Sequence, residues 1–188
     1  MTTVAPLALG GVFEITPRKF GDDRGFFSET WTPGALAGAG IDLDFVQDNH
    51  AYSLAAGTFR GLHYQLPPRA QAKLVRVILG EIFDVAVDVR VGSPTFGRWT
   101  GARLSDANGH QFYVPEGFAH GFAVVSDVAE VEYKCSAFYD VADEIAIRFD
   151  DPAIGVAWPV TSPILSRRDA GALPLAEHLP QLPPFAAP

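Results

Sequence analysis

The chain has 188 residues, of which 22 are acidic and 14 are basic, and its formal net charge at pH 7 is −8. A chain of this length suits one domain, so we expect a single domain over residues 1–188. Such a domain buries enough surface to need no disulfide or metal for stability. The acidic balance disfavours nucleic-acid binding, which needs a basic face, but a local arginine cluster can still bind a small phosphorylated ligand.

The chain contains one cysteine and no long apolar run. Cys135 lies in an alternating apolar stretch, which predicts a small buried thiol rather than a catalytic one. The start of the sequence lacks the basic segment and the apolar stretch of a signal peptide. A membrane-spanning helix needs about 18 consecutive apolar residues, and the sequence has no such run. We therefore expect a cytoplasmic protein that does not bind membranes.

Alternation of apolar and polar residues with a period of two dominates the middle of the chain, as in strands with one wetter face. The expected strands are Phe59–Gln65, Lys73–Leu79, Glu81–Arg90, Arg98–Leu104, His110–Val114, Phe118–Val125, Glu130–Phe138 and Glu144–Phe149. Gly80 predicts a turn or bulge, and Asn108-Gly109 predicts a tight hairpin. Short strands separated by frequent turn signals are typical of an all-β sandwich or barrel.

Helix signals are weak and lie outside this region. One short helix is expected to start within Thr32–Ala37, where Pro33 suits the first turn. Another is expected within Asp169–Leu179, and order is expected to end in the proline-rich segment 180–188.

Basic and polar groups concentrate in Gly57–Lys73, which contains Arg60, His63, Gln65 and Arg69. If Phe59–Gln65 is a strand, His63 and Gln65 lie on the same face. A lone histidine is more often structural than catalytic. The neighbouring basic groups favour a functional site, because an apolar core would not tolerate them.

The segment Gly109–His120 has the spacing G-x5-P-x-G-x2-H, which resembles the second motif of the cupin barrels. In those barrels the histidine points to the interior. Metal-binding cupins add an H-x-H pair and a glutamate, but the matching position here reads His63-Tyr64-Gln65. Two imidazoles and an amide are a poor divalent site, so we expect no metal.

Beyond this motif, the chain resembles the dTDP-4-dehydrorhamnose 3,5-epimerase family from about Gly10 to Leu175. The similar blocks are FGDDRGFFSETW (Phe20–Trp31), FVQDNH (Phe45–His50), RGLHYQ (Arg60–Gln65), AKLVRV (Ala72–Val77), DVAVDVRVGSPTFGRW (Asp84–Trp99), VPEGFAHGF (Val114–Phe122) and VEYK (Val131–Lys134). One block alone would only hint at a cupin, whereas the ordered set is specific. The resemblance implies a cupin-like jelly-roll β-barrel with a few short peripheral helices.

The resemblance also implies conversion of dTDP-4-dehydro-6-deoxy-D-glucose to dTDP-4-dehydro-L-rhamnose, with inversion of the carbons on either side of a ketone. A ketone acidifies the neighbouring C–H bonds because the carbanion delocalises onto oxygen as an enolate. The reaction needs a base on one face, a proton donor on the other and a positive group at the oxygen. No hydride leaves and no G-x-G-x-x-G motif follows a strand, so we expect no cofactor.

Similarity to the family assigns the catalytic roles. His63 is the base, and Asp169 orients its ring and stabilises the imidazolium. Lys73 stabilises the enolate as a compact ammonium. Tyr133 is the acid, because a phenol with an ordinary pKa near 10 stays protonated at neutral pH. Without the family, Tyr133 would be interpreted as a packing residue, and Asp169 equally well as a carboxylate at a helix N-terminus.

The substrate-binding positions are carried over in the same way. They are Arg24, Glu29, Gln47, Asn49, Arg60, Lys73, His120, Tyr139, Glu144 and Arg168. Arginine suits pyrophosphate because its planar fork donates two parallel hydrogen bonds, and the pair Phe138-Tyr139 matches the region that stacks on thymine. In the family, the segment around Arg24 reaches into the neighbouring subunit's site. The resemblance therefore implies a homodimer with site residues shared between subunits.

Two segments beside the site depart from the family. The loop AYSLAAGTF after His50 carries no basic residue, and LPPRAQAK, which ends at Lys73, holds two prolines where a flexible linker is expected. Nucleotide or sugar preference can therefore differ. Three alternatives stay open: an enzyme that epimerises only carbon 3, a non-catalytic nucleotide-sugar-binding cupin, and a metal-dependent cupin.

Overall fold

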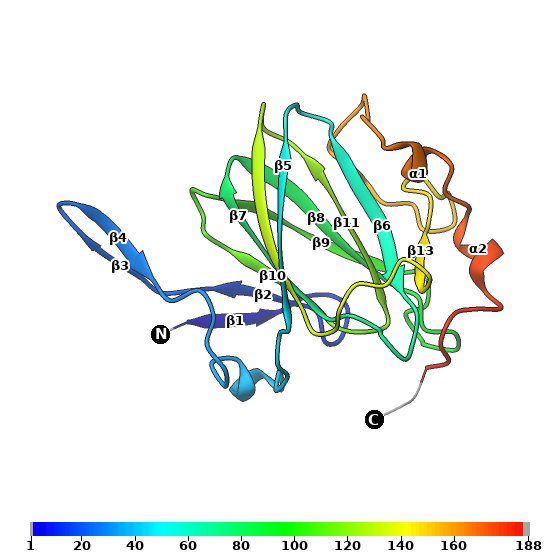
Figure 1. Ribbon diagram of the computed structural model, residues 1–188, viewed down its shortest axis with the longest axis horizontal. Helices are drawn as coiled ribbons and strands as arrows, with labels where there is room; N and C mark the ends of the chain where they lie inside the picture. The colour runs from blue at the N-terminus through cyan, green and yellow to red at the C-terminus, as the bar shows by residue number, and fades with distance from the viewer. Residues whose placement is uncertain (1, 186–188) are drawn as a thin grey trace.

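Two antiparallel sheets face each other in the computed structural model, which describes residues 2–185 (Figure 1). The six-stranded sheet has the order β1 (Thr3–Pro6), β2 (Phe13–Thr16), β10 (Gln111–Val114), β7 (Lys73–Leu79), β12 (Ala129–Cys135) and β5 (Gln47–Ser53). The five-stranded sheet has the order β13 (Glu144–Ala146), β6 (Phe59–Gln65), β11 (Phe118–Val124), β8 (Glu81–Asp88) and β9 (Trp99–Ser105). The predicted all-β, cupin-like fold is confirmed.

The main apolar core lies between the two sheets. Val75, Val77 and Val131 from the six-stranded sheet pack with Ile82 and Leu104 from the five-stranded one. On β7 and β12, alternate residues continue this inward row, and the register places Lys73 opposite Cys135. Because side chains two residues apart share a face, the row that forms the core also carries Lys73 and Tyr133 towards one end of the interior.

The C-terminal segment covers the outer face of the five-stranded sheet. The two helices α1 (Arg167–Ala170) and α2 (Leu175–His178) lie beside β6 and β13 (Figure 1). Leu175 and Leu182 are buried there against Leu62 and Val87. This cover brings α1, which is far away in sequence, next to the strand that carries His63.

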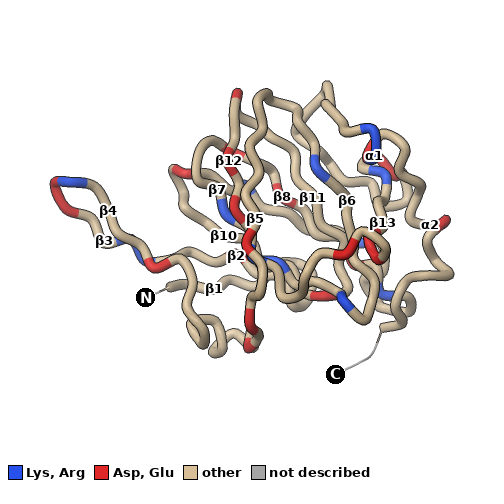
Figure 2. The backbone as a smooth tube through the Cα atoms, viewed as in Figure 1, with Lys and Arg blue, Asp and Glu red and all other residues tan. Residues whose placement is uncertain are grey.

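A hairpin of β3 (Lys19–Asp22) and β4 (Gly25–Ser28) projects away from both sheets (Figure 1). Its phenylalanines are exposed: Phe26 by 63% and Phe27 by 68%. Figure 2 shows charges of both signs at its tip, where Arg24 pairs with Asp22. An arm with this much exposed apolar surface is typical of an element that packs on another molecule.

The hairpin predicted at Asn108-Gly109 is wrong, because β9 and β10 belong to different sheets. Gly109 does have a positive φ of 66°, but among residues 2–185 every residue with positive φ is a glycine. Asn108 instead accepts hydrogen bonds with its side-chain oxygen from the backbone amides of Ser105 and His110, at 3.0 and 2.9 Å. The turn carries the chain from one sheet to the other. Gly80 is confirmed as a turn, with a φ of 83°.

Both helix predictions need correction. The segment 33–36 forms turns, and a single 3-10 turn, η1 (Ala37–Ala39), follows them. The segment Asp169–Leu179 splits into α1 and α2, because Gly171 ends the first helix and Pro174 precedes the second. Order also extends further than predicted, since Pro184 forms a bridge with Val91; residues 186–188 lie outside the described part.

Several strand ends also differ from the prediction. β8 ends at Asp88, β12 ends at Cys135, and β13 contains only Glu144–Ala146. Cys135 itself is buried, as expected, and burial raises the pKa of its thiol.

Candidate active site

One cleft brings together the four residues predicted to be catalytic. A hollow of about 360 Å³ is lined by Arg60, His63, Lys73, His120, Tyr133 and Asp169, among others. A second hollow of about 270 Å³ shares three of them and adds Gln47, Asn49, Tyr139 and Glu144. The shared residues are His63, Lys73 and Tyr133. The two hollows are therefore two parts of one cleft, with three of the four predicted catalytic residues at their junction.

His63 and Asp169 form the pair that the sequence predicts. The Nε2 atom of His63 on β6 lies 2.7 Å from Oδ1 of Asp169 on α1. Burial alone would raise the pKa of the Asp169 carboxyl, but hydrogen bonds from His63 and Ser166 lower it below its usual value. An ionised carboxylate only accepts hydrogen bonds, so Nε2 carries the proton. Nδ1, which lies 3.7 Å from Oε1 of Glu144, is the nitrogen free to accept a proton.

Lys73 lies on β7, in the same sheet as Tyr133, with its ammonium 6.0 Å from the centre of the Tyr133 ring. Burial lowers the pKa of Lys73, although Cys135, Glu144 and Asp84 act in the opposite direction. An ammonium with few water neighbours interacts strongly with a nearby negative charge. The cleft therefore offers a cation where a developing oxyanion would need one.

Tyr133 faces the cleft from the opposite sheet to His63. It lies on β12 between Asn49 of β5 and Val75 of β7, whereas His63 lies on β6 of the five-stranded sheet. Burial raises the pKa of the Tyr133 hydroxyl, so the hydroxyl stays protonated at neutral pH. A proton acceptor and a proton donor thus stand on opposite walls.

A second histidine–carboxylate pair lies beside the first. The Nε2 atom of His120 is 2.6 Å from Oδ1 of Asp84, and His120 lies opposite His63 in the register of β11 and β6. Asp84 is completely buried, and its Oδ2 atom has no hydrogen-bond partner among residues 2–185. Alternation in the sequence predicts the wetter face of the strand for Asp84, so the sequence alone missed it as a site residue. One feature of the sequence could have indicated it: Asp84 shares a strand face with the apolar residue Ala86, and the structure shows that Ala86 is buried.

The mouth of the cleft is organised around Glu144. The Tyr139 hydroxyl donates to Oε2 of Glu144 at 2.8 Å, and Arg168 donates to the same oxygen. Gln47 accepts a hydrogen bond from the Tyr139 amide and donates one to Asn49, both at 2.9 Å. Tyr139 and Phe138 are exposed by 50% and 66%, so an aromatic surface is available at this mouth.

Of three charged residues predicted to bind the substrate, Arg60 lies in the cleft, whereas Arg24 and Glu29 lie outside it. Arg60 lines the cleft, and its guanidinium donates to the Tyr52 carbonyl at 3.0 Å. Arg24 lies in the turn of the projecting arm with 89% of its side chain exposed. Glu29 follows the arm and is exposed. In one chain, neither Arg24 nor Glu29 lines the described cleft.

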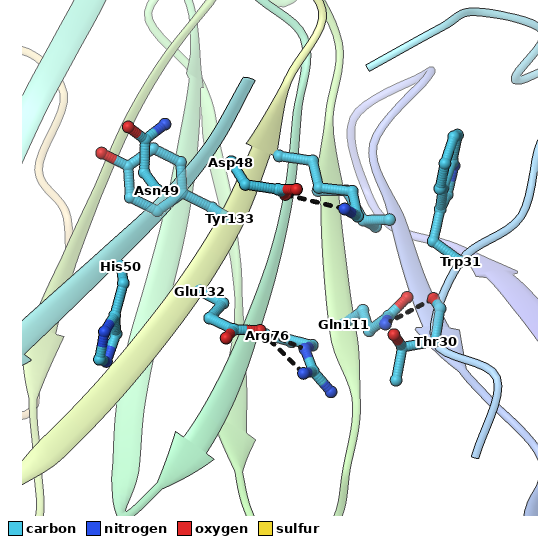
Figure 3. Close-up of a pocket in the computed structure, with 11 residues that line it drawn as sticks. Thr30, Trp31, Asp48, Asn49, His50, Arg76, Gln111, Glu132 and Tyr133 are labelled. Atoms are coloured by element: carbon cyan, nitrogen blue, oxygen red, sulfur yellow. Dashed lines mark hydrogen bonds and ion pairs between the residues drawn. The ribbon is translucent and has the colours of Figure 1, made fainter. Parts of the chain in front are cut away.

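A separate pocket of about 370 Å³ lies on the outer face of the six-stranded sheet (Figure 3). Its charged side chains pair with one another: Arg76 with Glu132 and Lys134 with Asp48, each at 2.8 Å. It shares Tyr133 and Asn49 with the cleft but is not lined by the histidine–aspartate pairs. We assign it no part in the chemistry of the cleft.

Within residues 2–185, no group of three or more His, Cys, Asp or Glu side chains is placed to hold a metal ion. In the same range, no helix is long and apolar enough to span a membrane. The expectations of no metal and no cofactor stay predictions.

A β-barrel cleft with a histidine–aspartate pair on one wall and a protonated tyrosine with a nearby lysine on the other defines an enzyme that moves protons at carbon. The family model described as dTDP-4-dehydrorhamnose 3,5-epimerase matches residues 6–177. The chain belongs to this family.

Individual relatives agree with this membership. The dTDP-4-dehydrorhamnose 3,5-epimerase of Shigella flexneri is 52% identical over 84% of this chain and 86% of its own length. A dTDP-4-dehydrorhamnose 3-epimerase of Streptomyces niveus is 43% identical over 92% of this chain and 83% of its own. The crystal structure of a dTDP-6-deoxy-D-glucose-3,5-epimerase from Legionella pneumophila, in complex with dTDP-4-keto-L-rhamnose, covers all of both chains with 42% identity and a TM-score of 0.95.

Proposed function

We propose that this protein converts dTDP-4-dehydro-6-deoxy-D-glucose to dTDP-4-dehydro-L-rhamnose by moving protons at carbons 3 and 5. The observation that carries the proposal is the placement of His63 and Tyr133 on opposite walls of one cleft. Inversion at carbon requires removal of a proton from one face and its return to the other. A base on one wall and a hydroxyl on the other are the two groups that such an inversion needs.

The geometry supports the following order of steps. Nδ1 of His63 accepts the proton from the carbon next to the ketone, and Asp169 stabilises the imidazolium that forms. The electron pair moves onto the ketone oxygen, where the Lys73 ammonium stabilises the enolate. Tyr133 then donates its hydroxyl proton to the opposite face of the carbon. Exchange with solvent restores both groups for the second carbon.

The nucleotide occupies the mouth of the cleft in this proposal. Tyr139 provides the surface on which thymine stacks, and Arg60 and Arg168 attract the pyrophosphate. Gln47, Asn49 and Glu144 supply hydrogen bonds around it. His120, fixed by Asp84, contacts the sugar.

We infer that the working unit is a homodimer. The exposed phenylalanines of the arm suit packing on a second copy of the chain. Arg24 and Glu29 lie on or next to that arm, outside the cleft of their own chain. In a symmetric dimer, each arm would bring these residues to the partner's cleft. The cytoplasmic location stays a prediction.

The test is incubation with the proposed substrate in deuterated water, followed by NMR at carbons 3 and 5. Deuterium at both carbons is expected for the wild type. The variant H63A is expected to lose at least roughly 10²–10⁴-fold in rate, because the general base is gone. H110A is the matched control, since His110 pairs with Glu14 outside the cleft.

The alternatives give different outcomes in the same experiment. Label at carbon 3 alone would replace the proposal by a 3-epimerase, the activity in the name of the Streptomyces niveus relative. Binding of dTDP with no label at either carbon would indicate a non-catalytic nucleotide-sugar-binding protein. Exchange that disappears on treatment with a chelator would indicate a metal-dependent enzyme.

A further inference from the structure

Ser166 contacts the second oxygen of the carboxylate that holds the base. Its hydroxyl donates to Oδ2 of Asp169 at 2.8 Å, while Oδ1 of the same carboxylate faces His63 at 2.7 Å. The Ser166 oxygen also accepts a hydrogen bond from the Asp169 backbone amide at 3.1 Å, as the N-cap of α1. The two oxygens of Asp169 are thus divided between the base and this serine.

The segment before Ser166 is fixed to the strand that carries His63. The Ile164 amide donates to the Gly57 carbonyl at 2.8 Å, and the Phe59 amide donates to the Ile164 carbonyl at 2.9 Å. Phe59 begins β6, and His63 lies four residues later on the same strand. The position of Ser166 relative to His63 is therefore set by backbone hydrogen bonds rather than by side chains alone.

An aspartate needs such a contact if its direction is to be defined. The terminal torsion of an aspartate is broad and nearly two-fold, so a carboxylate with one free oxygen can turn. A hydroxyl that donates to Oδ2 restricts this rotation and directs Oδ1 to the Nε2–H of His63. That hydrogen bond in turn decides which ring nitrogen is free to accept a proton.

We propose that Ser166 is a positioning residue for the base: through Asp169 it fixes the orientation and the tautomer of His63. The proposal rests on the proposed function, because it assigns His63 the role of base. Ser166 itself need not contact the substrate.

The variant S166A tests this role. We expect kcat to fall about tenfold. This loss corresponds to the lower end of the range for a hydrogen bond to a charged group. The lower end applies because Ser166 is exposed. KM is expected to stay within about twofold, since the nucleotide contacts are intact. S166T is expected to restore kcat, because threonine also caps helices and keeps the hydroxyl.

S93A is the matched control. The Ser93 hydroxyl donates to the buried Asp88 at 2.6 Å, outside the cleft, so this variant removes the same kind of bond without touching the base. Its kcat per folded molecule is expected to equal that of the wild type. A loss of kcat in S93A equal to that in S166A would mean that general destabilisation explains both, and would overturn the proposal.

A double-mutant cycle with D169N separates a positioning role from an independent one. If Ser166 acts through the Asp169 carboxylate, S166A added to D169N lowers the residual exchange rate by less than about twofold. A tenfold loss in both backgrounds, or no loss in the wild-type background, would refute it. A wild-type enzyme without any exchange would instead contradict the proposed function.

The NMR signal of the His63 Nε2 proton is a readout that does not depend on activity. This proton is expected to exchange faster with water in S166A than in the wild type or S166T. Equal exchange rates in all three proteins would refute the positioning role.

Discussion

His63 and His120 each contact a carboxylate through the Nε2 atom. The two carboxylates differ in their surroundings. The Asp169 carboxylate accepts a hydrogen bond from the Ser166 hydroxyl in addition to its contact with His63. Asp84 has His120 and an unpartnered oxygen in a completely buried position. A buried carboxylate with so few partners is costly unless a positive charge lies nearby. This assigns different electrostatic settings to two histidines that lie opposite each other on adjacent strands.

The ionisation of Asp169 predicts how stability depends on pH. Hydrogen bonds hold the pKa of this carboxyl in the folded protein below its ordinary value of 3.8. A lowered folded pKa adds stability that is fully present above the unfolded pKa and is lost as the pH falls through the folded pKa. The free energy of unfolding of the wild type is therefore expected to exceed that of D169N most clearly above about pH 5. The difference is expected to narrow as the pH falls below the ordinary aspartate pKa of 3.8.

Urea unfolding of both proteins between neutral and strongly acidic pH measures this difference. D151N is a useful comparison, because Asp151 is also buried but, among residues 2–185, its side chain accepts hydrogen bonds from two backbone amides, those of Ala153 and Leu175, and not from a histidine. A gap between the wild type and D169N that stays constant down to the lowest pH would contradict an ionised Asp169–His63 pair.

At the scale of single elements, the central strands could be predicted from the sequence, but their partners could not. β6 and β7 match the expected bounds because their alternation reflects burial of one face, which is a local property. The turn at Asn108-Gly109 has the composition of a hairpin, yet the chain crosses to the other sheet there. Sheet membership depends on which face meets the core, and this is decided by contacts far apart in sequence.

The same distinction applies to the candidate site. His63, Lys73 and Tyr133 line one hollow, as expected from the resemblance to the family, because the strands that carry them fix the faces of their side chains. Asp84 was missed because alternation alone does not tell which face of a strand is wet when both faces are covered. The residues of the arm stay untested, since their proposed place lies in another chain.

Gly80 illustrates an element whose geometry depends on one residue. It joins β7 to β8 across the two sheets with a φ of 83°, and a Cβ atom there would overlap the Val128 carbonyl oxygen. We expect G80A to lower the free energy of unfolding by about 1–3 kcal/mol, because both the positive φ and the overlap oppose a side chain. G38A is the control, since a Cβ atom added to Gly38 in η1 would meet no atom within 4 Å and Gly38 has no positive φ. Chemical denaturation measures both, and equal stabilities would show that the turn adapts.

At the scale of the whole molecule, the excess of negative charge contrasts with a cleft that is lined by Arg60 and Lys73 and has Arg168 paired with Glu144 at its mouth. Arg168 pairs with Glu144, and Lys73 lies where burial lowers its pKa and disfavours its charge. An incoming pyrophosphate would therefore gain from additional cations. The arm is the element suited to bring one, because Arg24 at its tip pairs with its neighbour Asp22 and has 89% of its side chain exposed. Shared sites would make the dimer a requirement for catalysis rather than for stability alone.

A mixing experiment tests whether sites are shared. R24A and H63A are each expected to be nearly inactive, R24A because the partner's cleft loses its added cation and H63A because the base is absent. In a mixed dimer, the cleft of the R24A chain has its own His63 and receives Arg24 from the H63A chain, so that one site is complete. Random exchange at equal concentrations gives mixed dimers in half of the population, so about a quarter of the wild-type rate is expected.

If Arg24 served its own chain, no mixed dimer would contain a complete site and the rate would stay at the level of the parents. A mixture of H63A and K73A is the control for any gain in rate that mixing causes by other means. Both residues line the cleft of the same chain, so no mixed dimer contains a complete site and the rate is expected to stay at the level of the parents.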